Sequence, residues 1–152
     1  MNSRDPINLL LVEDNESDIK LTIMAFDCGD LKNNIQVVRD GEEAINYLFR
    51  KEKFSDKEIY PKPDLVLLDI NLPKFDGFTV LKKIKEDENL KITPVIMMTS
   101  SGYEDDITRS YKCGATSYMQ KPVDFDKFID LVNGFNFYWQ SINKLPKVKQ
   151  NE

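Results

Sequence analysis

The fold is decided by the stretch Asp64-Leu65-Val66-Leu67-Leu68-Asp69-Ile70-Asn71-Leu72-Pro73, in which an apolar run ends at a carboxylate and a loop follows. Two other segments end in a similar way. The apolar run 7–12 leads into Glu13-Asp14, and the segment 116–119 leads to Lys121-Pro122. In an open parallel sheet, ligands sit outside the carboxyl ends of the strands. Three carboxylates and a lysine meeting at that edge would bind a divalent cation together with an anionic phosphoryl group.

Composition narrows the class of protein. A chain of 152 residues is one ordinary domain. An apolar content of 41% and a charged content of 31% are globular values, so we expect a folded core. The net charge of −5 argues against a nucleic-acid partner, which needs a basic surface. No apolar run approaches the length of a membrane span, and the N-terminus lacks the apolar region of a signal peptide, so we expect no membrane partner.

Histidine and cysteine restrict the chemistry further. The chain has no histidine, which excludes a Ser/His/Asp triad, a histidine-ligated zinc and a phosphohistidine carrier. Its two cysteines, Cys28 and Cys113, are far apart and in no metal-ligand pattern. That usage suits a reducing compartment, so we expect a cytoplasmic protein.

The chain alternates strand and helix patterns. We predict strands near 7–12, 35–39, 64–69, 94–99 and 116–119. We predict helices near 16–28, 41–52, 76–87, 103–113 and 124–142. With right-handed crossovers, these units predict a flavodoxin-like α/β fold, a doubly wound parallel sheet of five strands in the order 2-1-3-4-5 with five helices. Strands one and three would then lie side by side at the switch point.

Several local signals refine this prediction. The more polar segment 35–39 suits an edge strand, and Asp76 is placed to cap the helix that follows it. The segment 51–63 is polar with two prolines and indicates a long loop. We expect a single domain over residues 1–143 and a polar, frayed tail over 144–152.

The residues Glu13-Asp14, Asp69, Thr99-Ser100 and Lys121-Pro122, at these spacings, resemble the receiver domain of two-component response regulators. The resemblance covers roughly residues 7 to 140. It implies that Asp69 is the phosphoacceptor and that Glu13 and Asp14 help to hold Mg²⁺, directly or through water. It also implies that Asn71 contributes its backbone carbonyl to the metal.

The same resemblance implies roles for three further positions. Thr99 and Lys121 would contact the phosphoryl group, and Tyr118 would be the aromatic switch residue. The peptide bond between Lys121 and Pro122 would be cis, a state that costs little only before proline. The protein would assist its own phosphorylation and dephosphorylation without being an enzyme that turns over a separate substrate.

Phosphoryl transfer to Asp69 is also chemically reasonable when the residues are considered without the family resemblance. An aspartate is ionised at neutral pH, so it needs no general base to attack phosphorus. Repulsion between the carboxylates and the incoming phosphoryl group is the obstacle, and Mg²⁺ would relieve it. Lys121 adds a second positive charge and Thr99 a hydroxyl donor, where charge spreads during transfer.

Other readings of these residues stay open. Glu13-Asp14 could simply begin a helix, where acids favour the N-terminal dipole, and Asp69 could end a strand as a turn former. A haloacid-dehalogenase-like phosphatase would want a second acid where this chain has Asn71. A flavodoxin-like cofactor binder would need a phosphate loop in place of the acidic segment 11–16. A receiver-like scaffold that is never phosphorylated is the main alternative.

The chain carries no output domain that the sequence reveals, so we expect a stand-alone receiver whose output is binding. It looks like the single-domain regulators paired with phytochrome-type or other hybrid histidine kinases. Aromatic residues continue past the expected inner face of the last helix, at Phe137, Tyr138 and Trp139. We predict a homodimer or a kinase-docking face built from segments 103–113, 116–119 and 124–142, the alternative being that these aromatics pack on the chain's own 51–63 loop.

Overall fold

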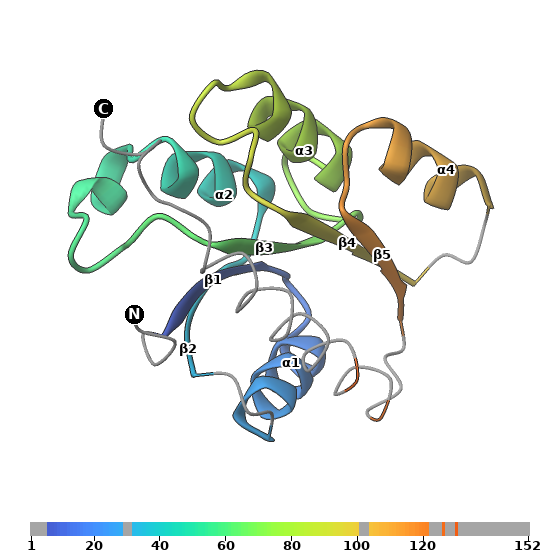
Figure 1. The fold of residues 1–152 in the computed structure, drawn as a ribbon, viewed down its shortest axis with the longest axis horizontal. Coiled ribbons are helices and arrows are strands. Elements are labelled where there is room, and N and C mark those ends of the chain that lie inside the picture. Colours follow the sequence, from blue (N-terminus) through green and yellow to red (C-terminus); the bar gives the residue numbers. More distant parts are fainter. Residues whose placement is uncertain (1–5, 29–31, 101–103, 122–125, 127–129, 131–152) are drawn as a thin grey trace, which may run out of the picture.

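A parallel sheet of five strands forms the centre of the molecule in a computed structural model that describes residues 6–28, 32–100, 104–121, 126 and 130 (Figure 1). The strand order is β2-β1-β3-β4-β5, which confirms the predicted topology. The strands are β1 (Ile7–Val12), β2 (Asn33–Val38), β3 (Leu65–Asp69), β4 (Val95–Thr99) and β5 (Ser117–Gln120). All neighbouring strands pair in parallel, with Val12 beside both Val38 and Leu68.

Helices cover the sheet on both sides. Figure 1 shows α2, α3 and α4 on one face and α1 on the other. Their bounds are α1 (Glu16–Cys28), α2 (Gly41–Leu48), α3 (Gly77–Glu86) and α4 (Glu104–Lys112). Three predictions fall outside the described residues: the helix over 124–142, the cis peptide before Pro122 and the tail over 144–152. Within 124–142 the structure describes only Asp126 and Asp130, and both are helical. Among the helices that the structure describes, none is long and apolar enough to span a bilayer.

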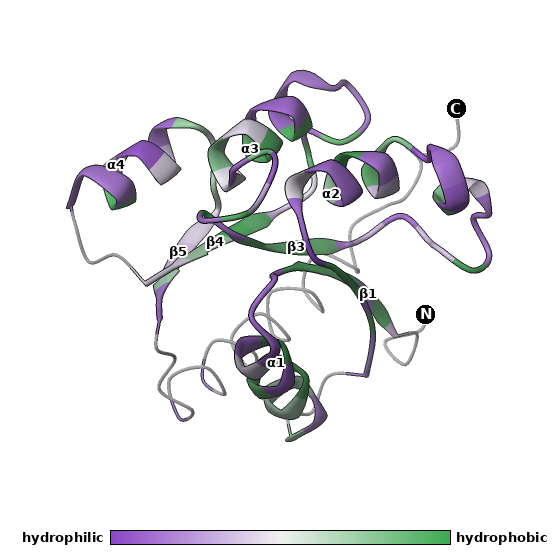
Figure 2. Cartoon of the chain, turned by 180° about the vertical axis from the view of Figure 1, so that it is seen from behind, coloured by the Kyte–Doolittle hydropathy of each residue, from purple (hydrophilic) through white to green (hydrophobic). Residues whose placement is uncertain are grey.

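The alternation of side chains along each strand divides the core into two layers. On β1, Leu10 and Val12 pack in the cluster with α2 and α3, whereas Leu9 and Leu11 pack in the cluster with α1. Both layers are apolar because helices cover both faces of a parallel sheet. Figure 2 shows that β1, β3 and β4 are hydrophobic along their length, while α4 is mostly hydrophilic.

Caps explain where two of the helices begin. The side chain of Asp76 accepts a hydrogen bond from the backbone N–H of Thr79, as predicted, and Asp40 accepts one from Glu43 at the start of α2. The predicted helix 41–52 is too long, because Arg50 adopts a φ of 59°, in the left-handed region that ends helices.

The prediction of a plain polar loop over 51–63 is wrong in part. A short 3₁₀ helix, η1 (Glu52–Ser55), forms inside it, and Phe54 is buried. The ring of Phe54 lies 5.2 Å from that of Tyr47 and 5.0 Å from that of Tyr60, measured between centroids. These aromatic contacts account for the order of a segment whose composition is polar.

The N-terminus of α2 lies directly against the loop that follows β3. The backbone N–H of Gly41 donates to the carbonyl of Pro73 over 3.1 Å. A Cβ atom at Gly41 would collide with the backbone of Phe75, so only glycine permits this approach. The contact fixes the β3–α3 loop from outside.

We predict that Gly41→Ala lowers the free energy of unfolding by about 1–3 kcal/mol, because α2 and the β3–α3 loop must separate to make room for the methyl group. Urea denaturation measures the change. The control is Thr79→Ala on the exposed face of α3, which we expect to stay within about 0.5 kcal/mol of wild type. Equal stability of Gly41→Ala and Thr79→Ala would show that the loop does not depend on this contact.

Candidate functional site

Three strand ends meet at one edge of the sheet. Glu13 and Asp14 follow β1, Asp69 is the last residue of β3, and Lys121 follows β5. The backbone N–H of Lys121 donates to the carbonyl of Thr99 over 2.6 Å, which extends the pairing of β4 and β5 to the position of the lysine. The order of the strands therefore brings together side chains that are far apart in the sequence.

The acidic part of the site consists of Glu13, Asp14 and Asp69. Each of them offers a carboxylate oxygen, and these three oxygens lie within 4.8 Å of one another. Glu13 and Asp69 are buried, whereas Asp14 is exposed. Two buried carboxylates with an accessible third beside them form a ligand set that suits a hard divalent cation, which prefers oxygen ligands.

The ammonium group of Lys121 lies among these acids, with 11% of the side chain exposed. Its Nζ donates to Oε1 of Glu13 over 3.0 Å and to Oδ2 of Asp69 over 3.1 Å. A third acid, Asp18, accepts from the same nitrogen through Oδ2 over 3.0 Å. One positive charge thus joins three carboxylates that come from different elements.

Asp18 was missed by the sequence reasoning. It belongs to the first turn of α1, where acids are common for reasons of the helix dipole alone. Asn15 precedes that helix and its Oδ1 accepts from the backbone N–H of Asp18 over 2.9 Å, the contact of an N-cap. The sequence does contain this signal, Asn15 followed three residues later by an acid, but not the partner of that acid.

Backbone donors hold the two buried carboxylates in place. Oδ1 of Asp69 accepts from the N–H of Asn71 over 3.1 Å, and Oε2 of Glu13 accepts from the N–H of Asn15 over the same distance. Each carboxylate therefore has one oxygen fixed by the loop that follows it and another bound to Lys121. The expected contribution of the Asn71 carbonyl to a metal stays a prediction.

Two further predicted residues, Thr99 and Tyr118, lie on the neighbouring strands β4 and β5. Thr99 is completely buried at the end of β4 and reaches Lys121 through its backbone carbonyl. Tyr118 lies on the edge strand β5, paired with Met97 of β4. Burial and, second, the charge of Asp106 raise the pKa of Tyr118.

The electrostatics of the site favour an added cation. Burial, and then the neighbouring charge of Asp69, raise the pKa of Glu13 to about 7, although its hydrogen bond to Lys121 works in the opposite direction. Burial lowers the pKa of Lys121, but the contacts with Asp18, Asp69 and Glu13 outweigh it and the pKa rises. Lys121 alone does not compensate the buried acids, and a divalent cation would.

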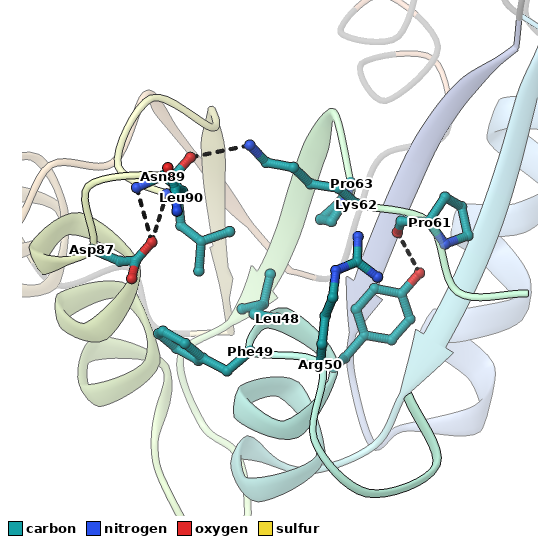
Figure 3. Close-up of a pocket in the computed structure, with 10 residues that line it drawn as sticks. Leu48, Phe49, Arg50, Pro61, Lys62, Pro63, Asp87, Asn89 and Leu90 are labelled. Carbon is teal, nitrogen blue, oxygen red and sulfur yellow. Dashed lines mark hydrogen bonds between the residues drawn. The ribbon is translucent and has the colours of Figure 1, made fainter. Parts of the chain in front are cut away.

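A cavity among the described residues lies elsewhere in the fold (Figure 3). It has a volume of about 400 Å³ and is lined by the C-terminal end of α2, the residues before β3 and the loop after α3. Leu48 and Leu90 line it, and Lys62 reaches across it to the carbonyl of Asn89 over 3.1 Å. These segments lie where the strands begin, at the opposite end of the sheet from Asp69, so the cavity takes no part in this chemistry.

Comparison with known proteins identifies the family to which the chain is similar. The family model of the response regulator receiver domain matches residues 9–133. The chain is 36% identical to the probable methanogenesis regulatory protein FilR2 of Methanothrix harundinacea, over 96% of this chain and 92% of that protein. It is 33% identical to the response regulator Rcp1 of Synechocystis sp., over 95% of this chain and 96% of Rcp1.

Solved structures agree with the fold. The phosphorylated cyanobacterial phytochrome response regulator RcpA superposes with a TM-score of 0.79 at 37% identity, covering 93% of this chain and 99% of RcpA. The Mn²⁺-bound form of Rcp1 superposes with a TM-score of 0.77 at 34% identity, with the same coverage. A metal-bound form is therefore recorded for a protein that shares this fold.

We predict that, without divalent cations, the free energy of unfolding falls by roughly 1–3 kcal/mol as the pH rises from about 4.5 to about 7. The pKa of Glu13 is raised from 4.5 to about 7 on folding, so the folded state holds more protons in this window and loses stability as they leave. Urea unfolding in a chelator measures the slope.

Glu13→Gln should flatten this dependence because the amide does not titrate. Glu16→Gln removes the same charge from an exposed position on α1 and should keep the wild-type slope. An identical slope in wild type and Glu13→Gln would contradict the assignment of the effect to Glu13.

Proposed function

The chain belongs to the response regulator receiver family, and from that premise we propose that Asp69 accepts a phosphoryl group from a histidine kinase. The observation that supports this role most directly is the environment of the Asp69 carboxylate. It is buried at the end of β3, with the Lys121 ammonium 3.1 Å from one oxygen and the Asn71 N–H 3.1 Å from the other. The oxygens are thus oriented, and a positive charge lies beside them.

The proposed transfer follows from this arrangement. A carboxylate oxygen of Asp69 attacks phosphorus, the bond from phosphorus to the donor imidazole breaks, and the imidazole leaves and takes up a proton. The product is an acyl phosphate on Asp69. Lys121 stabilises the negative charge that spreads over the phosphoryl oxygens, and the hydroxyl of Thr99 is proposed to donate to one of them.

We propose Mg²⁺ as the metal, held by Glu13, Asp14, Asp69 and the backbone carbonyl of Asn71. The residues fit, because three carboxylate oxygens lie within 4.8 Å and the acids outnumber the single lysine. The ion would neutralise charge on the phosphoryl oxygens when bound. Rcp1, which shares this fold, has been solved in a Mn²⁺-bound form, which supports a divalent cation as the ligand of the acidic cluster.

The switch is proposed to act through Thr99 and Tyr118 on α4. Within α4, whose residues are all described, Ser110 alone is fully buried. The guanidinium of Arg109 lies 4.1 Å from the centre of the Phe78 ring and connects α4 to α3 by a cation–π contact. A helix with so little buried apolar surface is a low-stability element that a phosphoryl group can shift.

We propose a sensor or hybrid histidine kinase of the phytochrome type as the partner, in the cytoplasm. The phytochrome response regulator RcpA, similar over nearly its whole length, supports this subgroup. A homodimer through α4, β5 and the segment 124–142 remains our proposal for the output. Tyr111 on α4 is 50% exposed, which gives that surface an aromatic contact.

We predict that wild type, incubated with phosphoramidate and Mg²⁺, gains the mass of one phosphoryl group and that Asp69→Asn does not. The amide that replaces the carboxylate lacks the anionic nucleophile. Intact-mass spectrometry measures the gain. The control is Asp40→Asn, which keeps a good N-cap on α2 and should be labelled like wild type.

Labelling of Asp69→Asn at the wild-type rate would refute the role of Asp69. Failure of wild type to be labelled by phosphoramidate or by a phosphorylated kinase would favour the scaffold that is never phosphorylated.

We predict that Thr99→Ala is still phosphorylated but that its α4 no longer responds. In wild type the phosphoryl group should draw the hydroxyl of Thr99 inward and release space for Tyr118, changing amide exchange across residues 104–120. Hydrogen exchange measured with and without phosphorylation checks this. An equal response in wild type and Thr99→Ala would disprove the coupling.

A further inference from the structure

We propose that Asp18 is a positioning residue that keeps the ammonium of Lys121 in the site when a cation and a phosphoryl group occupy Glu13 and Asp69. This inference rests on the proposed function. Asp18 is not one of the three acidic residues expected as metal ligands, which are Glu13, Asp14 and Asp69. Its basis is the third ion pair of Lys121, 3.0 Å from Nζ to Oδ2 of Asp18.

The backbone of Asp18 is fixed by hydrogen bonds in the first turn of α1. Its backbone N–H donates to Asn15, and its carbonyl accepts from the hydroxyl of Thr22, which is buried. The next residue, Ile19, is part of the core between α1 and the sheet. The carboxylate of Asp18 therefore projects from the first turn of a packed helix, whereas Glu13 and Asp69 lie at the ends of strands β1 and β3.

The other two partners of Lys121 are the oxygens that a metal would need. Glu13 contacts Nζ through both oxygens, at 3.0 and 3.3 Å, and Asp69 contacts it through Oδ2. A cation bound to these carboxylates competes with the ammonium for them. Asp18 remains available, so Lys121 keeps one fixed charged partner and stays beside the phosphoryl oxygens.

Without that partner, the long lysine side chain gains freedom when the cation binds. Fixing the flexible side chain of Lys121 costs conformational entropy. The ion pair with Asp18 fixes it before the reaction, so less entropy is lost during phosphoryl transfer. Loss of Asp18 should therefore weaken catalysis by Lys121 without removing the nucleophile. A direct effect of the Asp18 charge on the cation is the competing explanation, and a double-mutant cycle separates the two.

The first experiment measures the rate constant for labelling by phosphoramidate with saturating Mg²⁺. We expect Asp18→Asn to lower this rate constant about tenfold. That loss is smaller than the loss expected when a group that stabilises the developing charge is removed entirely. Glu16→Gln, on the same turn of α1 but paired with Arg39, should change it less than about twofold. In a Lys121→Met background, Asp18→Asn should have no further effect.

An unchanged rate in Asp18→Asn would overturn the proposal, as would an equal loss in the Lys121→Met background, because the charge would then act without the lysine. Circular dichroism confirms that each variant is folded.

The second experiment observes the lysine itself and needs no phosphorylation. In ¹⁵N-labelled protein with Mg²⁺, an ordered ammonium gives a resolved N–H signal, assigned by its absence in Lys121→Met. We expect this signal in wild type and in Glu16→Gln, and its loss in Asp18→Asn. Its persistence in Asp18→Asn, or its absence from wild type, would overturn the proposal. If neither phosphoramidate nor a phosphorylated kinase labels wild type, the proposed function fails, and this second experiment still tests the role of Asp18.

Discussion

The site depends on one interaction: a single ammonium group forms ion pairs with three carboxylates at the edge of the sheet. Lys121 pairs with Glu13, Asp18 and Asp69, and two of these acids are buried. A buried carboxylate is costly unless it is paired or bound to a metal. The raised pKa of Glu13 shows that the lysine compensates this cost incompletely. The site is therefore ordered enough to hold its acids in place and still favours a second cation.

The fold holds these charged side chains in place because they lie at the ends of rigid strands. The apolar strands β1 and β3 are packed from both faces, which fixes their register and with it the separation of Glu13 from Asp69. Gly77 opens α3 directly against the backbone of Asp69 and Ile70, where a Cβ would collide. Its N–H donates to the carbonyl of Ile70 over 2.8 Å. The carboxylate of Asp69 thus projects from a strand that is held on both faces, whereas α4, which is described in full, buries only Ser110.

Most of this architecture could be predicted from the sequence because its causes are local. Continuous apolar runs identify β1, β3 and β4, and an aspartate before Gly77 identifies the start of α3. The ion pair between Asp18 and Lys121 could not be predicted, since the two residues are 103 positions apart and meet only if α1 begins at the right turn beside the end of β5. The order within 51–63 was also missed, because it comes from the contacts of Phe54 with Tyr47 and Tyr60 and not from local propensity. The roles of the individual site residues remain predictions from the resemblance.

We propose that the carboxylates around Lys121 are a shared site for its ammonium group and a divalent cation. A crystal structure of the protein grown with Mg²⁺ and beryllofluoride tests it most directly. We expect one Mg²⁺ at about 2.1 Å from an Asp69 oxygen, with Glu13 or Asp14 binding it directly or through water. We also expect the ammonium of Lys121 to remain paired with Asp18 while it contacts the fluoride atoms. A cation bound elsewhere, or density that leaves the contacts of Lys121 with Glu13 and Asp69 unchanged and Asp69 unmodified, would contradict it.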